Sequence, residues 1–206
     1  MPQRIALFGG SFDPIHLGHL IIARSVVERL DLDRIIFLPS ATPPHKMAAV
    51  LASPQHRAAM VRLAIADEPI FDFSDYDLLR DGPTYTVETI AHFRADLGAD
   101  AELYWLIGAD SLPELTTWYR ARDLIDSCHI VTAARPGWER IDFNALRPHF
   151  NDNQIARLEA DILETPRIDI SSTNIRSRAA AGKSVRFLVP ESVHQYIVEH
   201  DLYRAT

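Results

Sequence analysis

The sequence predicts an α/β fold in which helices cover both faces of a parallel sheet. Short apolar runs alternate along the chain with segments of helical periodicity, and the first run ends in two glycines directly before a helical segment. The 206 residues are 47% hydrophobic, which is enough to bury such a sheet without disulfides. Strands that alternate with helices favour parallel pairing, so we expect a doubly wound, Rossmann-like sheet.

The first 38 residues have the pattern of one β-α-β unit. Residues 4–8 are apolar and end at Gly9 and Gly10, which predicts a buried strand followed by a tight turn. Residues 17–30 carry apolar side chains at helical spacing, and residues 34–38 form the next apolar run. The carboxyl end of the first strand is therefore the first place to look for a ligand.

The alternation continues through the rest of the chain. The further helices that we expect are 54–67, 86–97, 173–181 and 190–200. The further strands that we expect are 71–74, 103–107, 130–133 and 168–170. Residues 40–55 are expected to form a long loop. Without repeats or a linker, residues 1–206 are predicted to form one domain with a small C-terminal helical part from about residue 171.

Composition and charge argue against several classes of partner. The net charge is −7 and basic residues do not cluster, so we expect no nucleic-acid partner. The apolar runs are far shorter than a membrane span, and the N-terminus lacks the pattern of a signal peptide. The single cysteine, Cys128, is expected to be a buried small hydrophobe and suits a reducing compartment. We therefore expect a cytoplasmic protein that binds small molecules; the sequence does not indicate its oligomeric state.

The peptide GGSFDPIHLGH, which begins at Gly9, predicts an anion site. Gly9 and Gly10 allow a ligand to approach the backbone closely and permit positive φ angles. His16 and His19 lie three residues apart at a helix start, so their rings should face the same way. Together with the helix N–H groups they would converge on one phosphate, for which Gly18 leaves room.

Two other interpretations of this peptide are open. The histidines can simply cap and pack the junction between strand and helix. They can also share a zinc ion, but a closed zinc site needs more ligands than His16 and His19 supply. Asp13 is the only carboxylate close by in the sequence. The position of the peptide after the first strand favours phosphate binding over both.

A second anion site is predicted at ISSTNIR, residues 170–176. Ser172 and Thr173 stand at a helix start, where hydroxyl side chains are good N-caps, and that is also the plain structural interpretation. Arg176 lies one turn into the helix and would point toward an anion together with the exposed N–H groups. A triphosphate that is bound at one end by the first motif requires a second hydroxyl-rich helix start to bind its other end.

These two motifs resemble those of the HxGH nucleotidyltransferases, which are Rossmann-like adenylyl- and cytidylyltransferases. Within that group the chain is similar to the bacterial nicotinate mononucleotide adenylyltransferases. The resemblance covers nearly the whole chain and includes PPHK at 43–46, GPTYT at 82–86, GADS at 108–111, TWY at 117–119, RPG at 135–137 and DLYR at 201–204. Ser11 and Lys46 replace residues that are often Thr or Arg in the family, and they keep the hydroxyl and the charge.

The resemblance implies adenylyl transfer from ATP to nicotinate mononucleotide, which forms nicotinate adenine dinucleotide and pyrophosphate in NAD biosynthesis. The catalytic residues that it implies are His16, His19, Lys46 and Arg176. The implied ATP-binding residues are Gly9, Gly10, Ser11, Phe12, His19, Gly108, Asp110, Ser172, Thr173 and Arg176. Mg²⁺ would be carried with ATP, coordinated largely by phosphates and water, so no protein metal site is expected.

The acceptor would be held by Thr86, Trp118 and Tyr119. Trp118 can stack on a pyridine ring, and the backbone N–H of Thr86 can bind its carboxylate; an aromatic core pair and a helix start are the plain alternatives. Lys46, after two prolines, can place a charge over the phosphates or stay solvated. Asp110 follows a strand, where it can bind a ribose or cap a helix.

Two other functions remain open. Phosphopantetheine adenylyltransferases and cytidylyltransferases share HxGH, but they do not need an aromatic pocket for a pyridine carboxylate. A nucleotide-binding sensor on the same fold would not need to keep His16, His19 and Arg176. A turnover assay with ATP and several acceptors separates the three functions.

Overall fold

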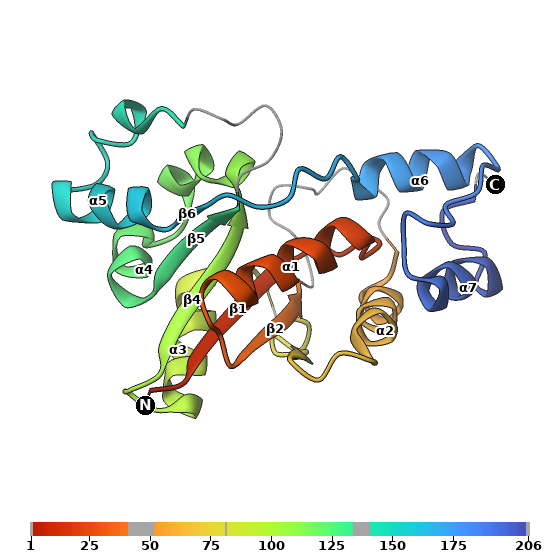
Figure 1. The fold of residues 1–206 in the computed structure, drawn as a ribbon, viewed down its shortest axis with the longest axis horizontal. Coiled ribbons are helices and arrows are strands. Elements are labelled where there is room, and N and C mark those ends of the chain that lie inside the picture. The colour runs from red at the N-terminus through yellow and green to blue at the C-terminus, as the bar shows by residue number, and fades with distance from the viewer. Residues whose placement is uncertain (1, 41–51, 81, 134–140, 205–206) are drawn as a thin grey trace.

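A parallel sheet forms the centre of the molecule (Figure 1). The computed structural model describes residues 2–40, 52–80, 82–133 and 141–204, and within them six strands pair in the order β3-β2-β1-β4-β5-β6. The strands are β1 (Arg4–Gly10), β2 (Arg34–Pro39), β3 (Phe71–Phe73), β4 (Glu102–Gly108), β5 (His129–Ala133) and β6 (Ile162–Leu163). Every neighbouring pair is parallel, and the order reverses between β1 and β4. The predicted doubly wound fold is confirmed.

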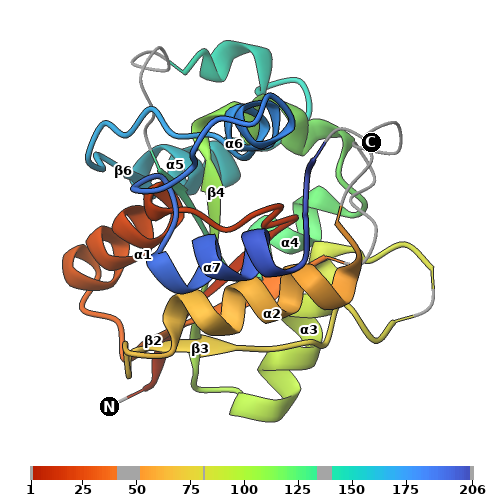
Figure 2. The ribbon, with the colours of Figure 1, turned by 90° about the vertical axis from the view of Figure 1, so that its right-hand side faces the viewer.

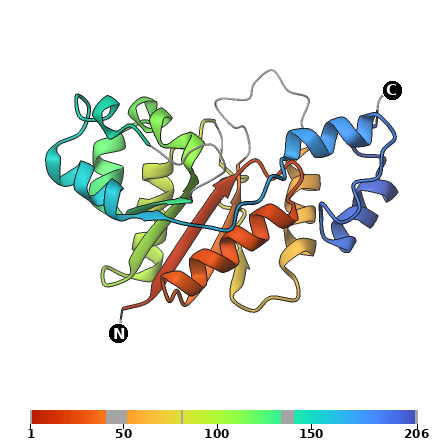
Figure 3. The same ribbon diagram turned by 45° about the horizontal axis from the view of Figure 1, so that its top comes forward.

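Helices cover both faces of this sheet. They are α1 (Leu17–Arg29), α2 (Pro54–Ile65), α3 (Thr86–Leu97), α4 (Ala121–Ser127), α5 (Asp152–Ala160), α6 (Ser172–Ala180) and α7 (Glu191–Glu199). Three short 3-10 helices are also described: η1 (Ala109–Ser111), η2 (Pro113–Thr117) and η3 (Phe143–Ala145). Figure 3 shows α1 across one face of the sheet, with α3 and α4 on the other. No helix in the described part of the chain has the length and apolar character of a membrane span.

Strand periodicity divides the core into two clusters. Ala6 and Phe8 of β1 belong to one cluster, whereas Ile5 and Leu7 belong to the other, as alternate residues of a strand must. The first cluster takes its helical residues from α1, α2, α6 and α7, and the second takes them from α3, α4 and α5. A sheet that is buried on both faces explains why its strands are continuous apolar runs.

Most of the expected elements are present within a residue or two of their predicted bounds, but the expected strand at 168–170 is wrong. The edge strand is β6, which pairs with Thr132 and Ala133 of β5. Ile168 packs instead near the start of α1. The sequence analysis did not predict α4 and α5. In α5 only Ile155 and Leu158 belong to the second cluster, and most other residues of the helix are polar, so few apolar positions mark it in the sequence.

The C-terminal helices return to the N-terminal half of the sheet. Figure 2 shows α7 lying alongside α2. The hydroxyl of Tyr196 is hydrogen-bonded to His56 Nδ1 at 2.9 Å, and Ser192 Oγ donates to the carbonyl of Leu63 at 3.1 Å. Because α6 and α7 share the first core cluster with α1 and α2, this packing favours a single domain, which stays a prediction.

Cys128 is buried at the end of α4, as expected. Burial raises the pKa of its thiol to about 12, so the group stays protonated at neutral pH. A buried neutral thiol acts as a small hydrophobe in the core.

The two glycines that end β1 allow close packing. A Cβ atom on Gly9 would lie 2.5 Å from ring atoms of Trp105, whose side chain is buried on the neighbouring strand β4. A Cβ atom on Gly10 would lie 3.2 Å from the ring of Phe12. The expected positive φ at Gly9 and Gly10 is wrong; in this segment the left-handed angle is at Phe12, with φ 44°.

We expect Gly9→Ala to destabilise the fold by about 1–3 kcal/mol, because the added methyl group overlaps the buried indole of Trp105. Gly10→Ala is the matched control and should destabilise less, since its contact is longer. Urea denaturation of the three proteins measures the difference. Equal stability of Gly9→Ala and the parent chain would contradict this account of the packing.

Candidate active site

The junction of β1 and α1 lies where the strand order reverses, at the carboxyl ends of the strands. In open α/β sheets this crevice is the usual ligand site. His16 is the N-cap of α1: its Nδ1 accepts the N–H of His19 at 3.3 Å, and Nδ1 of His19 accepts the N–H of His16 at 3.2 Å. The two rings stack with centroids 3.6 Å apart and an angle of 18° between their planes. The histidines therefore face the same way, as expected.

This reciprocal cap sets the protonation of both imidazoles. Each Nδ1 accepts a backbone N–H, so a neutral ring must carry its own proton on Nε2. A proton on Nδ1 would face the backbone N–H that the cap requires. The cap thus makes Nε2 of each neutral ring a hydrogen-bond donor, so the capping role of HxGH is compatible with the predicted phosphate binding.

The start of α1 offers fewer backbone donors than expected. The N–H of Leu17 donates to the carbonyl of Leu188 at 3.0 Å, and those of His16 and His19 belong to the cap. The room that we expected Gly18 to leave for a phosphate is also filled. A Cβ atom on Gly18 would lie 3.1 Å from Nδ1 of His16 and 3.2 Å from Ile168. Gly18 therefore allows these groups to pack, and the imidazoles become the main donors of this motif.

Aromatic side chains hold the ring of His19 in place. The rings of Phe12 and Phe8 meet it edge to face, with centroids at 5.1 and 5.9 Å. Phe12 is only 2% exposed, so its side chain belongs to the core, and any contact with ATP would involve its backbone. Gly108 ends β4, and the exposed Asp110 follows it in η1 at the same edge of the sheet.

The two predicted phosphate motifs meet directly. Arg176 Nη1 donates to the carbonyl oxygen of Asp13 at 2.8 Å, and Ser172 Oγ donates to the carbonyl of Pro14 at 3.0 Å. The hydroxyl of Thr173 accepts from Nη2 of Arg176 at 3.3 Å. The N-cap of α6 is Ser171 rather than Ser172 or Thr173. The hydroxyls expected to cap this helix instead join the motifs and orient Arg176.

A buried carboxylate lies beneath this contact. Asp13 is fully buried; its Oδ1 accepts the hydroxyl of Tyr203 at 2.7 Å and the N–H of Ala52 at 3.1 Å. Its Oδ2 lies 3.6 Å from Nη1 of Arg176. Sequence analysis assigned no role to Asp13 or Tyr203 in phosphate binding, although both lie in peptides that carry the resemblance.

A second arginine accompanies Asp13. Arg57 of α2 is 1% exposed, and its Nη1 donates to the carbonyl of Ser11 at 2.7 Å. Burial lowers the pKa of the Arg57 guanidinium, and the charge of Asp13 partly offsets that effect. Burial raises the pKa of the Tyr203 hydroxyl, and the charge of Asp13 raises it further. Tyr203 is therefore a neutral donor at physiological pH. Arg57 was missed because its helix gives no local sign of a buried charge.

The expected acceptor residues lie on the β4 side of the site. Thr86 is the first residue of α3, whose N-cap, Tyr85, makes no side-chain capping bond. The rings of Tyr85 and Tyr119 are 4.5 Å apart, which brings Tyr119 to this helix start. Trp118 packs against the second core cluster, and its Nε1 is buried without an acceptor in the described residues. A buried unpaired donor is uncommon in proteins and suits a pocket that a polar ligand completes.

Lys46, expected to act on the phosphates, lies outside the described residues. The described residues contain no group of three or more His, Cys, Asp or Glu side chains placed to hold a metal ion.

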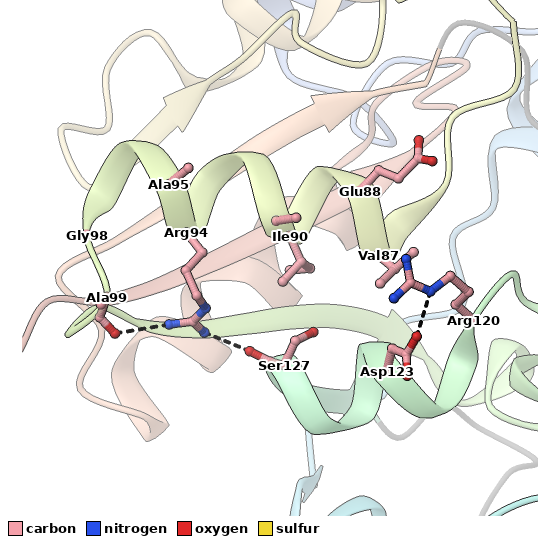
Figure 4. A pocket seen from close by; sticks show the side chains of 11 residues that line it. Val87, Glu88, Ile90, Arg94, Ala95, Gly98, Ala99, Arg120, Asp123 and Ser127 are labelled. Carbon is pink, nitrogen blue, oxygen red and sulfur yellow. Dashed lines mark hydrogen bonds and ion pairs between the residues drawn. The ribbon is translucent and has the colours of Figure 1, made fainter.

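A groove of 610 Å³ lies between α3 and α4 (Figure 4). Arg94 crosses one end, where its Nη2 donates to the carbonyl of Ser127 at 2.7 Å. Arg120 is paired with Asp123 at the other end. The groove is lined by neither histidine of the HxGH motif nor Arg176. The candidate active site is thus defined by its converging polar groups rather than by this groove.

The family model described as cytidylyltransferase-like matches residues 7–178. A protein of Symbiobacterium thermophilum named "probable nicotinate-nucleotide adenylyltransferase" is 43% identical over 200 residues, which cover 97% of this chain and 95% of the relative. A protein of the same name from Thermoanaerobacter sp. is 40% identical over 206 residues, with 98% and 94% covered.

A solved structure shares the fold. The Plasmodium falciparum nicotinic acid mononucleotide adenylyltransferase, complexed with NaAD, aligns with a TM-score of 0.76 at 18% identity. The alignment covers 98% of this chain and 97% of that one. The match of the family model and the 40–43% identity over nearly the full length place this chain in the nicotinate-nucleotide adenylyltransferase family.

Proposed function

We propose that this chain transfers the adenylyl group of ATP to nicotinate mononucleotide, forming nicotinate adenine dinucleotide and pyrophosphate. The observation that carries the proposal is the direct contact of the two phosphate motifs, at the carbonyls of Asp13 and Pro14. The names of the relatives, and the NaAD with which the P. falciparum enzyme is complexed, support the same reaction. We also place the reaction in the cytoplasm, where its substrate ATP is available.

For this reaction the protein must align the two substrates and stabilise the charge on the phosphoryl oxygens. The phosphate of a mononucleotide has a second pKa of about 6, so its oxygen is already a nucleophile at neutral pH. That oxygen attacks the α-phosphorus of ATP, the bond from this phosphorus to the bridging oxygen breaks, and pyrophosphate leaves with the electron pair. Such an in-line displacement needs no general base and depends on positioning and on donors aimed at the phosphoryl oxygens.

We assign the donors to the residues that converge at the junction. Nε2 of His16 and of His19 would donate to the α-phosphoryl oxygens, because the helix cap holds both rings in the donor form. Arg176, oriented by Asp13 and Thr173, would neutralise the departing pyrophosphate, and Lys46 would assist it from the preceding loop. Gly9, Gly10 and the backbone of Ser11 would lie against the nucleotide.

Mg²⁺ would enter with ATP. This cation keeps several waters and takes most of its remaining ligands from substrate phosphates, with one or two protein carboxylates at most. The exposed carboxylate of Asp110 at the end of β4 is compatible with such a need, and with the ribose role expected for it. When bound, the ion would reduce the negative charge that the nucleophile must approach.

The pyridine end of the acceptor would lie at the start of α3. The N–H groups of Thr86 and Tyr119 would bind its carboxylate, beside the paired rings of Tyr85 and Tyr119. Trp118 would contact the pyridine ring by its face or donate from its buried Nε1.

Two substitutions separate capping from catalysis. Asn is among the best N-cap residues, and Gln at the third helical position completes a capping box. His16→Asn and His19→Gln should therefore keep the melting temperature close to that of the parent chain but lower kcat by about 10²-fold, as removal of an oxyanion donor does. Steady-state kinetics and thermal denaturation test both. Full activity in either variant would show that the imidazoles serve only the helix.

The role of Arg176 depends on its forked guanidinium, which donates to Asp13 with one nitrogen and to Thr173 with the other. Arg176→Lys keeps the charge but loses this orientation, so its KM for ATP should rise about tenfold while KM for the acceptor stays nearly unchanged. Arg178, two residues further along α6, donates to the carbonyl of Ser184 and gives the control Arg178→Lys, which should change neither constant. An unchanged KM for ATP in Arg176→Lys and Arg176→Ala would exclude the assignment.

The acceptor pocket predicts a preference for acid over amide. Two N–H donors favour a charged carboxylate, and a carboxamide would turn an NH₂ group toward them. We expect kcat/KM for nicotinate mononucleotide to exceed that for nicotinamide mononucleotide by at least about tenfold. Trp118→Ala should raise KM for the acceptor far more than KM for ATP.

The same assay, run side by side with saturating Mg-ATP, tests the alternatives. Equal efficiency with the two mononucleotides would refute the carboxylate pocket. Faster turnover of phosphopantetheine would assign the chain to a different acceptor, and the absence of turnover with any acceptor would favour the sensor.

A further inference from the structure

The hydroxyl of Tyr203 reaches across 190 positions of sequence to Asp13, within the first phosphate motif. Both hydrogen bonds to the Asp13 side chain, from Tyr203 and from the N–H of Ala52, end on Oδ1. Oδ2 makes no hydrogen bond within the described residues. The carboxylate is therefore held in one orientation by two donors on the same oxygen.

That orientation controls how Asp13 meets Arg176. Nη1 of Arg176 donates to the backbone carbonyl of Asp13 at 2.8 Å but stays 3.6 Å from Oδ2, which is beyond hydrogen-bond distance. Thr173 accepts from Nη2 of the same guanidinium. The guanidinium thus donates its hydrogen bonds to a neutral carbonyl and a hydroxyl, and its ion pair with Oδ2 of Asp13 is the longer contact.

Tyr203 is itself held in an unusual backbone conformation. Its φ is 65°, a left-handed angle that is rare for a bulky side chain. Leu202 and Tyr203 pack against the first core cluster, and burial keeps the hydroxyl protonated and able to donate. Residues that the surrounding structure holds in such conformations gather at functional sites.

We propose that Tyr203 is a positioning residue for adenylyl transfer: its hydroxyl holds the Asp13 carboxylate so that Arg176 stays available to the triphosphate of ATP. This inference rests on the proposed role of Arg176. Without the hydroxyl, the Asp13 side chain can turn about its last torsion angle and form a close ion pair with Arg176. That pair would compete directly with the phosphates of ATP for the same donors.

The test is Tyr203→Phe, which removes one oxygen atom and leaves the packed ring. Its KM for ATP should rise about fivefold or more, as expected for the loss of one hydrogen bond, while KM for nicotinate mononucleotide stays within about twofold. Tyr196→Phe is the matched control. It removes another tyrosine hydroxyl of the C-terminal segment, one that is hydrogen-bonded to His56 of α2 and does not contact Asp13. It should leave both constants unchanged, even where it lowers the melting temperature equally.

Two further variants locate the effect. In an Arg176→Ala background, Tyr203→Phe should change KM for ATP no further, because the residue on which it acts is gone. Asp13→Asn removes the competing charge, so it should reverse the KM increase of Tyr203→Phe. Additive effects with Arg176→Ala, or an unchanged KM for ATP in Tyr203→Phe, would overturn the inference.

The outcomes also separate this inference from the function that it rests on. If Arg176→Ala alone leaves the KM for ATP unchanged, the proposed role of Arg176 fails. If Arg176→Ala raises that constant and Tyr203→Phe does not, only the role of Tyr203 fails. All variants are compared well below their melting temperatures, so that a loss of folded protein does not enter the kinetic constants.

Discussion

The negative charge of Asp13, buried between the N-terminal motif and the C-terminal segment, is the constraint on which the rest of the site depends. An unpaired charge in a protein interior is strongly destabilising, so other segments must supply donors and cations to it. Tyr203 and the N–H of Ala52 provide the donors, and Arg176 and Arg57 provide the cations. The start of α1, the segment before α2, α6 and the C-terminal turn therefore meet at one point.

The proposed phosphate site would be a consequence of that meeting. Arg176 donates to the carbonyl of Asp13, and Ser172 donates to the carbonyl of Pro14. The backbone of the N-terminal motif therefore positions side chains of the C-terminal motif. Adenylyl transfer gains most from alignment, because its nucleophile is already ionised. The two proposed phosphate motifs are joined through the carbonyls of Asp13 and Pro14, and this arrangement would provide such alignment for a bound ATP.

The sequence predicted what depends on local pattern and missed what depends on distant contacts. Strand periodicity and the double glycine led to the β-α-β unit and the doubly wound sheet. Residue types led to His16, His19 and Arg176 as proposed phosphate ligands, and the motifs that hold them are in direct contact. Arg57 could not be found, since its partner carbonyl at Ser11 is 46 residues away. The strand expected at 168–170 is wrong because apolar side chains suit a strand as well as other packing: Ile168 lies near the start of α1, and Ile170 packs against the first core cluster.

The HxGH motif shows why local pattern and chemistry coincide at this site. Asn and Gln at the two histidine positions would satisfy the same backbone N–H groups, so the cap alone does not require imidazole. An imidazole differs in having a second nitrogen, on the far side of the ring from the one that caps. When the cap occupies Nδ1, the proton of the neutral ring must be on Nε2, so the helix start itself creates two aligned donors. The hydrogen bonds that begin α1 are then the same ones that would prepare the proposed site for a phosphoryl group.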